Sequence, residues 1–218
     1  MKERFKLANH LFAFLLCTLF WFSCPARESS VASRVSPKLK QFLADHHQAA
    51  RILTNSISEV FSNRAVAIFY FYSEDESTAR AFHFYPSTVG TVDVVICVRE
   101  NQQPLDEFIC LLFETLNSRG EPQFTKLCEQ AQAGTISREN FVHGILKTEF
   151  EATKSTRALL ASFKVGRKEI AASQYYKHFT GCPTEFEAFL SYTKRLSRSR
   201  DVFKEYATQY DALRKTRQ

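Results

Sequence analysis

The sequence predicts an α+β domain: an N-terminal helix, a small and mostly antiparallel sheet of three or more strands, and then a helical C-terminal half. Three observations carry this prediction. Apolar residues recur at helical spacing from Leu39 to Phe61, and three β-branched and aromatic runs follow. Helical spacing then returns after Pro104 and continues almost to the end of the chain.

The N-terminal helix is expected to begin at Ser36 and Pro37, a capping residue followed by proline at the first helical position. His46 falls on the apolar stripe of this helix, whereas its neighbour His47 points elsewhere. We therefore interpret His46 as a satisfied core histidine rather than as a ligand.

Three strands are predicted next, at residues 65–72, 79–85 and 91–98. The polar turn Ser73–Glu76 separates the first two, and Pro86 and Gly90 precede the third. Such short connections predict an antiparallel meander, in which one strand could be out of order, and they exclude βαβ units.

The remaining pattern is helical. The segment 105–118 is apolar over most of its circumference, which is typical of a central, buried helix. The later helices are predicted from their start and stop signals. A short helix at 123–132 should end near Gly134, and a long one should be capped by Ser137. The capping box of Thr184 and Glu187 should open a helix at 185–197, and a last helix should begin at Asp201.

The first residues indicate export. Met1 to His10 carries three basic residues, and Leu11 to Cys24 is almost wholly apolar but too short to span a membrane. This pattern is typical of a secretory signal with cleavage after Ala26. Two alternatives stay open, a lipidated N-terminus at Cys24 and an uncleaved anchor. We expect residues 1–26 to be a signal peptide and residues 27–218 to form one domain in the periplasm, at the outer envelope or outside the cell.

The charge of the mature domain gives no indication of a nucleic-acid partner. Residues 1–26 hold three basic residues and one acid, so the formal charge falls from +6 to +4 when they are removed. Basic residues gather only near the C-terminus, where we expect a solvated helix face: Lys194, Arg195, Arg198 and Arg200. Membrane contact is expected only through the signal or a lipid at Cys24.

Four cysteines remain in the mature domain: Cys97, Cys110, Cys128 and Cys182. An even number outside the cytoplasm permits disulfides, but Cys97 and Cys110 lie in apolar segments, so buried thiols are an equal alternative.

Two carboxylates on predicted buried helix faces need an explanation, because burying a lone carboxylate is costly. Glu114 lies in the sequence Phe113-Glu114-x-x-Asn117, and Glu149 lies on the apolar stripe of the long helix. The first has the spacing of H-E-x-x-H with both histidines replaced. The chain has a predicted strand, then this helix, and then a later helix that carries a glutamate. This order resembles the core of the zincin metallopeptidases, specifically the gluzincins.

The resemblance covers residues 50–165, with 166–218 as a helical extension. The chain is also similar to uncharacterised exported bacterial proteins in which an F-E-x-x-N helix precedes one opening S-R-E-x-F, here Ser137–Phe141. In the gluzincins the two histidines and the later glutamate bind zinc, and the glutamate of the motif is the general base. Glu149 would occupy the place of the third ligand.

This chain departs from the family at the ligands. Phe113 cannot bind a metal and Asn117 is a weak zinc ligand, so we expect no metal, no cofactor and no zinc hydrolase activity. His83, His143 and His178 are the histidines that would have to rebuild a site, and we do not expect them to do so.

Without the resemblance, Glu114 and Asn117 would hydrogen-bond the surrounding chain and Glu149 would pair with a basic residue. With it, Glu114 and Glu149 should lie on adjacent helices facing one cleft, with Asn117 as an amide donor to Glu114.

The functional expectation is an exported, catalytically inactive metallopeptidase-like domain that binds or scaffolds an unknown envelope or extracellular protein. One alternative is an active hydrolase with a non-standard site around Glu114 and Glu149. Another is a helical envelope interaction module unrelated to zincins. The sequence holds no G-x-S-x-G, no glycine-rich phosphate loop and no cysteine beside a plausible base.

Overall fold

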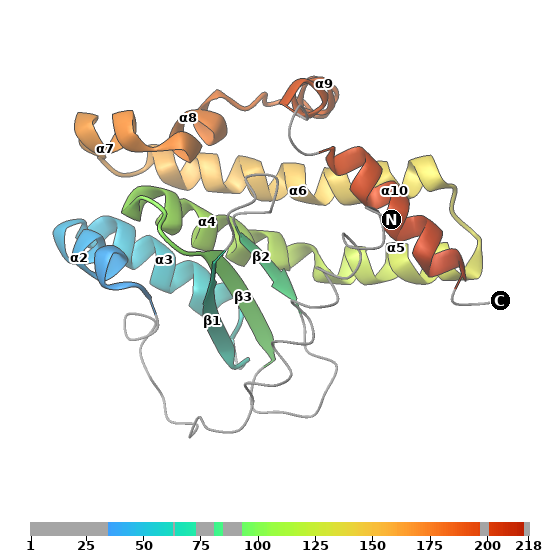
Figure 1. The fold of residues 1–218 in the computed structure, drawn as a ribbon, viewed down its shortest axis with the longest axis horizontal. Helices are drawn as coiled ribbons and strands as arrows, with labels where there is room; N and C mark the ends of the chain where they lie inside the picture. The colour runs from blue at the N-terminus through green and yellow to red at the C-terminus, as the bar shows by residue number, and fades with distance from the viewer. Residues whose placement is uncertain (1–34, 63, 73–80, 85–92, 197–200, 216–218) are drawn as a thin grey trace. The chain divides into compact units, whose positions relative to one another are not determined.

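A computed structural model describes residues 35–62, 64–72, 81–84, 93–196 and 201–215 (Figure 1). The fold is α+β, as the sequence predicts, with a small three-stranded sheet and a helical C-terminal half. The predicted signal at residues 1–26, the turn Ser73–Glu76, and Arg198 and Arg200 lie outside the described residues.

The predicted N-terminal helix is two helices, α2 (Pro37–Asp45) and α3 (His47–Val60). The predicted start is confirmed, because the Ser36 hydroxyl accepts a hydrogen bond from the Leu39 amide at 3.1 Å. The chain breaks at His46, whose φ of −123° and ψ of 71° are not helical. The prediction that the His46 ring is satisfied is confirmed, because Nδ1 lies 3.0 Å from the carbonyl oxygen of Phe42. The prediction that it lies in the core is wrong, because the ring is only partly buried at the corner between two helices.

The sheet contains β1 (Val66–Phe71), β2 (Ala81–Phe84) and β3 (Val94–Arg99) in the order β1-β3-β2. β3 runs parallel to β1 and antiparallel to β2, so the sheet is mixed. The out-of-order strand that the sequence analysis allowed is present, but the predicted antiparallel meander is wrong in the direction of β1, which pairs parallel. All five residues from Val94 to Val98 are buried. This uninterrupted apolar run suits the central strand, where both faces and both edges are covered.

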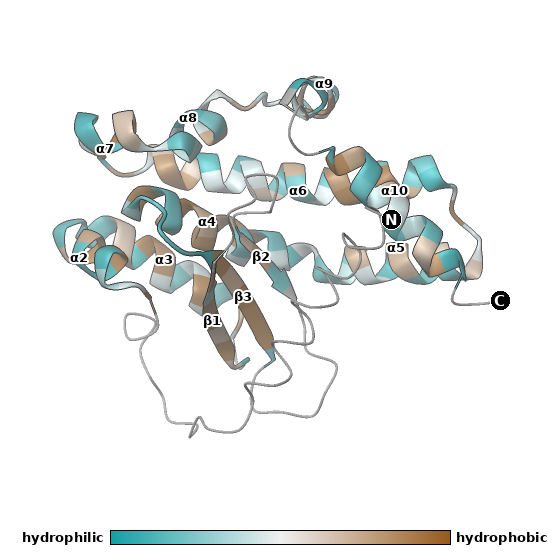
Figure 2. Ribbon diagram, in the orientation of Figure 1, coloured by the Kyte–Doolittle hydropathy of each residue, from teal (hydrophilic) through white to brown (hydrophobic). Residues whose placement is uncertain are grey.

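The central helix is α4 (Pro104–Asn117), which packs against the sheet on one side and against other helices around the rest of its surface (Figure 1). Its apolar residues join those of α2, α3, β3 and the long helix α6 (Arg138–Ala161) in the main core. Figure 2 shows the hydrophobic colouring concentrated on α4, β1 and β3. The prediction that this helix is central and buried is confirmed.

The C-terminal half continues with short and long helices whose predicted caps are largely confirmed. The elements are the 3₁₀ turn η2 (Ser118–Gly120), α5 (Glu121–Ala133), α6, α7 (Arg167–Ala172), α8 (Gln174–Gly181), α9 (Phe186–Leu196) and α10 (Val202–Lys215). α5 ends at Gly134, whose φ of 76° favours glycine. Ser137 and Asp201 accept hydrogen bonds from the amides of Asn140 and Lys204.

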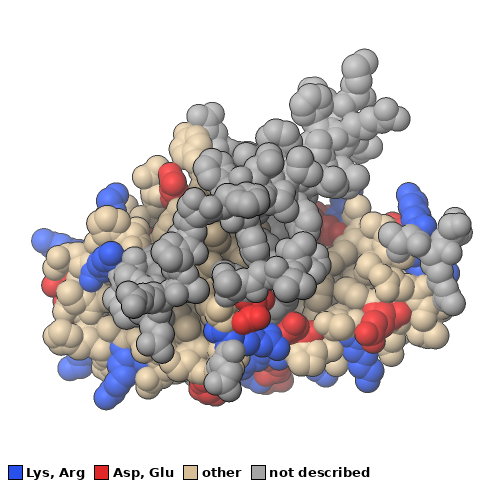
Figure 3. All heavy atoms as spheres, turned by 90° about the horizontal axis from the view of Figure 1, so that it is seen from below, with Lys and Arg blue, Asp and Glu red and all other residues tan. Residues whose placement is uncertain are grey.

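A second core joins α5, α6, α9 and α10. Among the described residues, no helix combines the length and the apolar character needed to cross a bilayer. On the side shown in Figure 3, the visible Lys and Arg side chains are interspersed with Asp and Glu.

Candidate functional site

α4 carries the sequence Phe113-Glu114-x-x-Asn117, on which the predicted resemblance depends. Pro104 occupies the first turn, and Asp106 and Glu107 follow where the positive end of the helix dipole favours acidic residues. Phe113 and Asn117 are one helical turn apart and both are half-buried. The Phe113 ring packs against Phe179 of α8, with 5.3 Å between the ring centroids. Phe113 therefore makes an aromatic packing contact between α4 and α8.

Glu114 faces the sheet. Its Oε2 lies 2.7 Å from Nδ1 of His83 on β2, and the two side chains are only 9% and 16% exposed. The hydrogen-bond partner of the buried carboxylate is thus an imidazole 31 residues earlier. The prediction that Asn117 is the donor to Glu114 is wrong, because the hydrogen bond of this carboxylate is made with His83. Of the three histidines considered for a rebuilt site, the structure brings His83 to the motif.

Glu149 lies on the inward stripe of α6, as predicted, and is half-buried. Its carboxylate accepts a hydrogen bond from the phenol of Tyr206 on α10. Tyr206 is thus a partner of Glu149 that the sequence analysis did not name, and the predicted pairing of Glu149 with a basic residue stays a prediction. α4 and α6 do pack against each other, as predicted, but Glu114 bonds to the sheet and Glu149 to the C-terminal helix.

Two further buried carboxylates on α4 were not predicted. Asp106 is 3% exposed and accepts hydrogen bonds from the Ser173 hydroxyl and from the amide of Tyr175 at 3.0 Å. It therefore holds the first turn of α8. A signal for this residue existed in the sequence, because a helix that is apolar all round leaves no exposed face for an acid.

Glu107 is also 3% exposed and belongs to a polar cluster with Ser36 and Tyr70. Its carboxylate accepts hydrogen bonds from the Tyr70 phenol and, at 2.7 Å, from the Ser36 hydroxyl. The Tyr70 oxygen in turn accepts the Ser36 amide at 2.8 Å. Burial, and then the neighbouring Glu107 carboxylate, raise the pKa of Tyr70 far above its ordinary value. The cluster joins α2, β1 and α4.

The other predicted histidines lie elsewhere. His143 on α6 meets the edge of the Phe186 ring, with 6.4 Å between centroids. His178 on α8 stacks on Tyr192 of α9 and its Nδ1 is 3.2 Å from the tyrosine oxygen. Burial lowers the pKa of His178, which favours the neutral imidazole.

Cys97, Cys110, Cys128 and Cys182, the four cysteines in the described part of the chain, are free thiols. Burial raises the pKa of Cys182 to about 11, against a smaller opposing effect of Arg157. Burial also raises the pKa of Cys128. Thiols with raised pKa values are poor nucleophiles at neutral pH, so neither resembles an activated cysteine.

The described part of the chain contains no group of three or more His, Cys, Asp or Glu side chains arranged to hold a metal ion. The chain matches no family model, no curated protein and no solved structure. The gluzincin resemblance therefore stays a prediction from the sequence.

Proposed function

We propose that this protein is an exported domain that acts by binding or scaffolding a protein partner at the cell envelope, and not by zinc-dependent hydrolysis. The observation that carries the proposal is that Phe113 and Glu114 of the motif contact neighbouring elements of the fold. Phe113 packs on Phe179, and the Glu114 carboxylate pairs with His83. Side chains that would supply chemistry in a metallopeptidase here hold α8 and β2 against the central helix.

The other buried acids of α4 support the same interpretation. Asp106 anchors α8, and Glu107 anchors α2 and β1. Glu114 is thus one of three buried carboxylates on one helix, each bonded to a different neighbouring element. A structural role accounts for its burial without any catalytic function.

A second candidate function is a hydrolase with a non-standard site, and the His83–Glu114 contact favours it. A carboxylate at Nδ1 orients an imidazole, as in catalytic dyads and triads. A helical interaction module unrelated to zincins is a third candidate, which shares the binding role of the first.

The first two proposals are separated by zinc content and turnover of the purified mature protein. With Phe113 and Asn117 at the ligand positions, we expect well under one equivalent of zinc, because a catalytic site needs three protein ligands. We also expect no hydrolysis of peptide or ester substrates that depends on Glu114. Stoichiometric zinc surviving mild chelation, or turnover abolished by Glu114→Gln in a folded variant, would favour the hydrolase.

A further inference from the structure

The last helix, α10, lies across α5 and α6 and contacts both of them (Figure 1). Apolar side chains of these two helices form most of the second core, against which α10 packs. Leu127 and Ala131 on α5 and Phe141 and Ile145 on α6 are at most 4% exposed. α10 therefore covers an apolar surface of α5 and α6, which we call the α10 site and define by these four residues.

α10 fits this surface with one face only. Its apolar side chains recur at the three- and four-residue spacing of one helix face and pack against the second core: Val202, Phe203, Tyr206, Ala207, Tyr210 and Leu213. The Tyr210 ring meets that of Phe141, with 5.6 Å between the centroids. No residue of α10 is itself buried, so this helix lies on the surface of the domain rather than inside it.

Polar contacts fix the direction and the register of α10 on the site. Arg138, the first residue of α6, pairs with Asp211 at 2.8 Å, and the two side chains are 55% and 46% exposed. Further along α6, the carboxylate of Glu149 accepts a hydrogen bond from the Tyr206 phenol. The α10 site therefore matches a helix that carries a phenol and, five positions later, an acid.

The α10 site does not need α10 for its shape. α5 and α6 pack against each other, and α6 also packs against α4 of the main core. At Gly144 the first two helices approach so closely that an added Cβ would lie 2.8 Å from the Leu127 side chain. A helix that rests on such a pre-formed surface can leave it while the rest of the domain stays folded.

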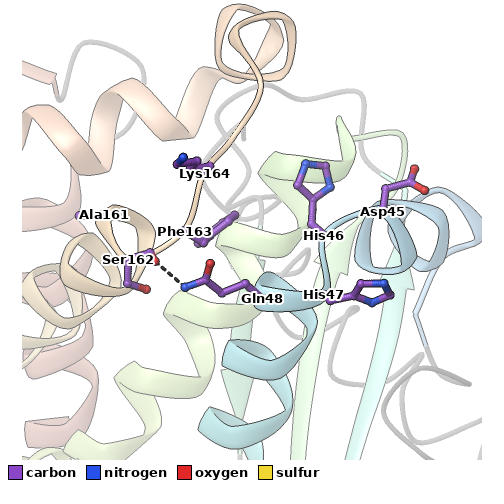
Figure 4. Close-up of a pocket in the computed structure, with 8 residues that line it drawn as sticks. All are labelled: Asp45, His46, His47, Gln48, Ala161, Ser162, Phe163 and Lys164. Atoms are coloured by element: carbon purple, nitrogen blue, oxygen red, sulfur yellow. Dashed lines mark hydrogen bonds between the residues drawn. The ribbon is translucent and has the colours of Figure 1, made fainter.

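A pocket at the other end of α6 gives a useful contrast. It has a volume of about 470 Å³ and lies between the corner of α2 and α3 and the segment that follows α6 (Figure 4). Its lining side chains do not converge, because Asp45 and His47 point away from Gln48, which donates to the Ser162 carbonyl. The α10 site, in contrast, already displays the chemistry of an occupant that fits it.

We propose that the protein partner docks on the α10 site, and that α10 is a displaceable occupant which a helix of the partner replaces. The partner segment is an amphipathic helix with aromatic and apolar side chains on one face and an acid beside that face, as in α10. α10 then limits the apparent affinity, since only molecules with an open site can bind. The inference rests on the proposed function, for which it names the binding surface and the class of partner.

The test uses a fluorescently labelled peptide of residues 201–215 as the probe for the partner helix, and fluorescence anisotropy measures its binding to the full mature protein. The wild type should bind it weakly. Tyr210→Ala in the protein should tighten peptide binding about tenfold, because the protein's own α10 loses an aromatic anchor and the site opens more often. Lys204→Gln is the matched control: Lys204 is exposed and lies outside the apolar stripe, so the affinity should stay unchanged.

A charge exchange determines whether the peptide occupies the α10 site. A peptide with Asp211→Arg should bind the wild-type protein about twofold to fivefold more weakly than the unchanged peptide, because it cannot pair with Arg138. On the Arg138→Glu protein, the order of the two peptides should reverse. Both substitutions are at partly exposed positions, so this comparison holds even if Tyr210→Ala does not fold.

An unchanged peptide affinity in Tyr210→Ala, or an order of the two peptides that does not reverse on Arg138→Glu, would overturn the proposal. Analytical ultracentrifugation of the mature protein tests the other occupant, a second copy. A concentration-dependent dimer that Tyr210→Ala abolishes would show that α10 of a second copy fills the site, and would also overturn the proposal. The proposed function fails by a different result, turnover that Glu114→Gln abolishes.

Discussion

At the scale of one residue, Glu114 shows how a hydrogen bond offsets the burial of a carboxylate. The carboxylate loses its contacts with water on burial, and the imidazole of His83 in the sheet replaces them with a hydrogen bond at 2.7 Å. Removing one partner of this hydrogen bond should lower the free energy of unfolding, because the other polar group then stays buried without a partner.

We expect Glu114→Gln to be tolerated, because the amide keeps the shape and can still accept a hydrogen bond from His83. Glu114→Leu should lower the free energy of unfolding by about 1–3 kcal/mol, because it removes the acceptor at Nδ1 of a half-buried ring. Urea denaturation followed by circular dichroism measures both changes.

The matched control is Glu151→Leu on α6, where the glutamate side chain is 58% exposed and a change within about 0.5 kcal/mol is expected. Equal costs for Leu at 114 and at 151 would contradict a stabilising role for the Glu114 carboxylate.

Tyr70 gives a second residue-scale prediction, at high pH. Its pKa is raised in the folded state by burial and by Glu107, so the folded chain keeps the phenolic proton longer than the unfolded chain does. The stability that this difference contributes is fully present below the ordinary tyrosine pKa of about 10 and is lost as the pH rises above it. Tyr70→Phe should therefore lose less stability than the wild type between about pH 8 and about pH 10.5.

Urea denaturation at the two pH values provides the measurement. Tyr72→Phe is the control, because Tyr72 is 66% exposed and its substitution should leave the alkaline loss unchanged. An identical loss in Tyr70→Phe and the wild type would show that Tyr70 does not ionise differently in the two states.

The candidate site could be predicted in part from single residues. Periodicity placed Glu114 and Glu149 on buried helix faces, because helical spacing is a local property. Their partners, His83 and Tyr206, come from elements 31 and 57 residues away. Such pairings depend on tertiary packing, which spacing within one helix does not encode.

At the scale of elements, α4 is the organising helix. Its apolar side chains fill the main core, and its three buried carboxylates bond to β2, to α2 and β1, and to α8. Hydrogen bonds are directional, whereas apolar contacts are not, so these acids can fix the relative placement of neighbours that hydrophobic packing alone would allow to slide.

Asp106 tests this idea. Asp106→Ala should cost about 1–3 kcal/mol of unfolding free energy, because the Ser173 hydroxyl and the amide at the start of α8 lose their acceptor in a buried place. Asp106→Asn should cost less, since its amide oxygen still accepts. Chemical denaturation measures the change in free energy.

A matched control is Asp211→Ala on α10, which removes an exposed ion pair with Arg138 and should cost about 0–1 kcal/mol. If Asp106→Ala costs no more than this surface substitution, the bond from α4 to α8 does not stabilise the fold.

The elements themselves were more predictable than their arrangement. Caps at Ser36, Ser137 and Asp201 act through hydrogen bonds to residues three positions away, and each was found where predicted. The break at His46 and the strand order were not predictable in this way. An apolar stripe continues through a helix break, and the parallel pairing of β1 with β3 joins residues 28 positions apart.

At the scale of the whole molecule, the strongest prediction concerns where the protein resides. The first residues of the sequence contain a basic start and an apolar run of signal length. A binding role at the envelope requires that the chain be exported, so the two claims fail together if export fails. Activity against a substrate would instead contradict the binding role alone.

We therefore expect protein isolated from its native host to begin at Arg27, or at a lipidated Cys24. Mass spectrometry of the intact N-terminus distinguishes these forms by the mass of the acyl chains. Cys24→Ala should abolish a lipidated form but leave simple cleavage after Ala26 unaffected, which makes it a control for the mode of processing. Replacing Lys2, Arg4 and Lys6 by glutamate should block export, because the basic start orients the signal at the membrane. An intact Met1 on a wild-type protein found in the cytoplasm would contradict the prediction.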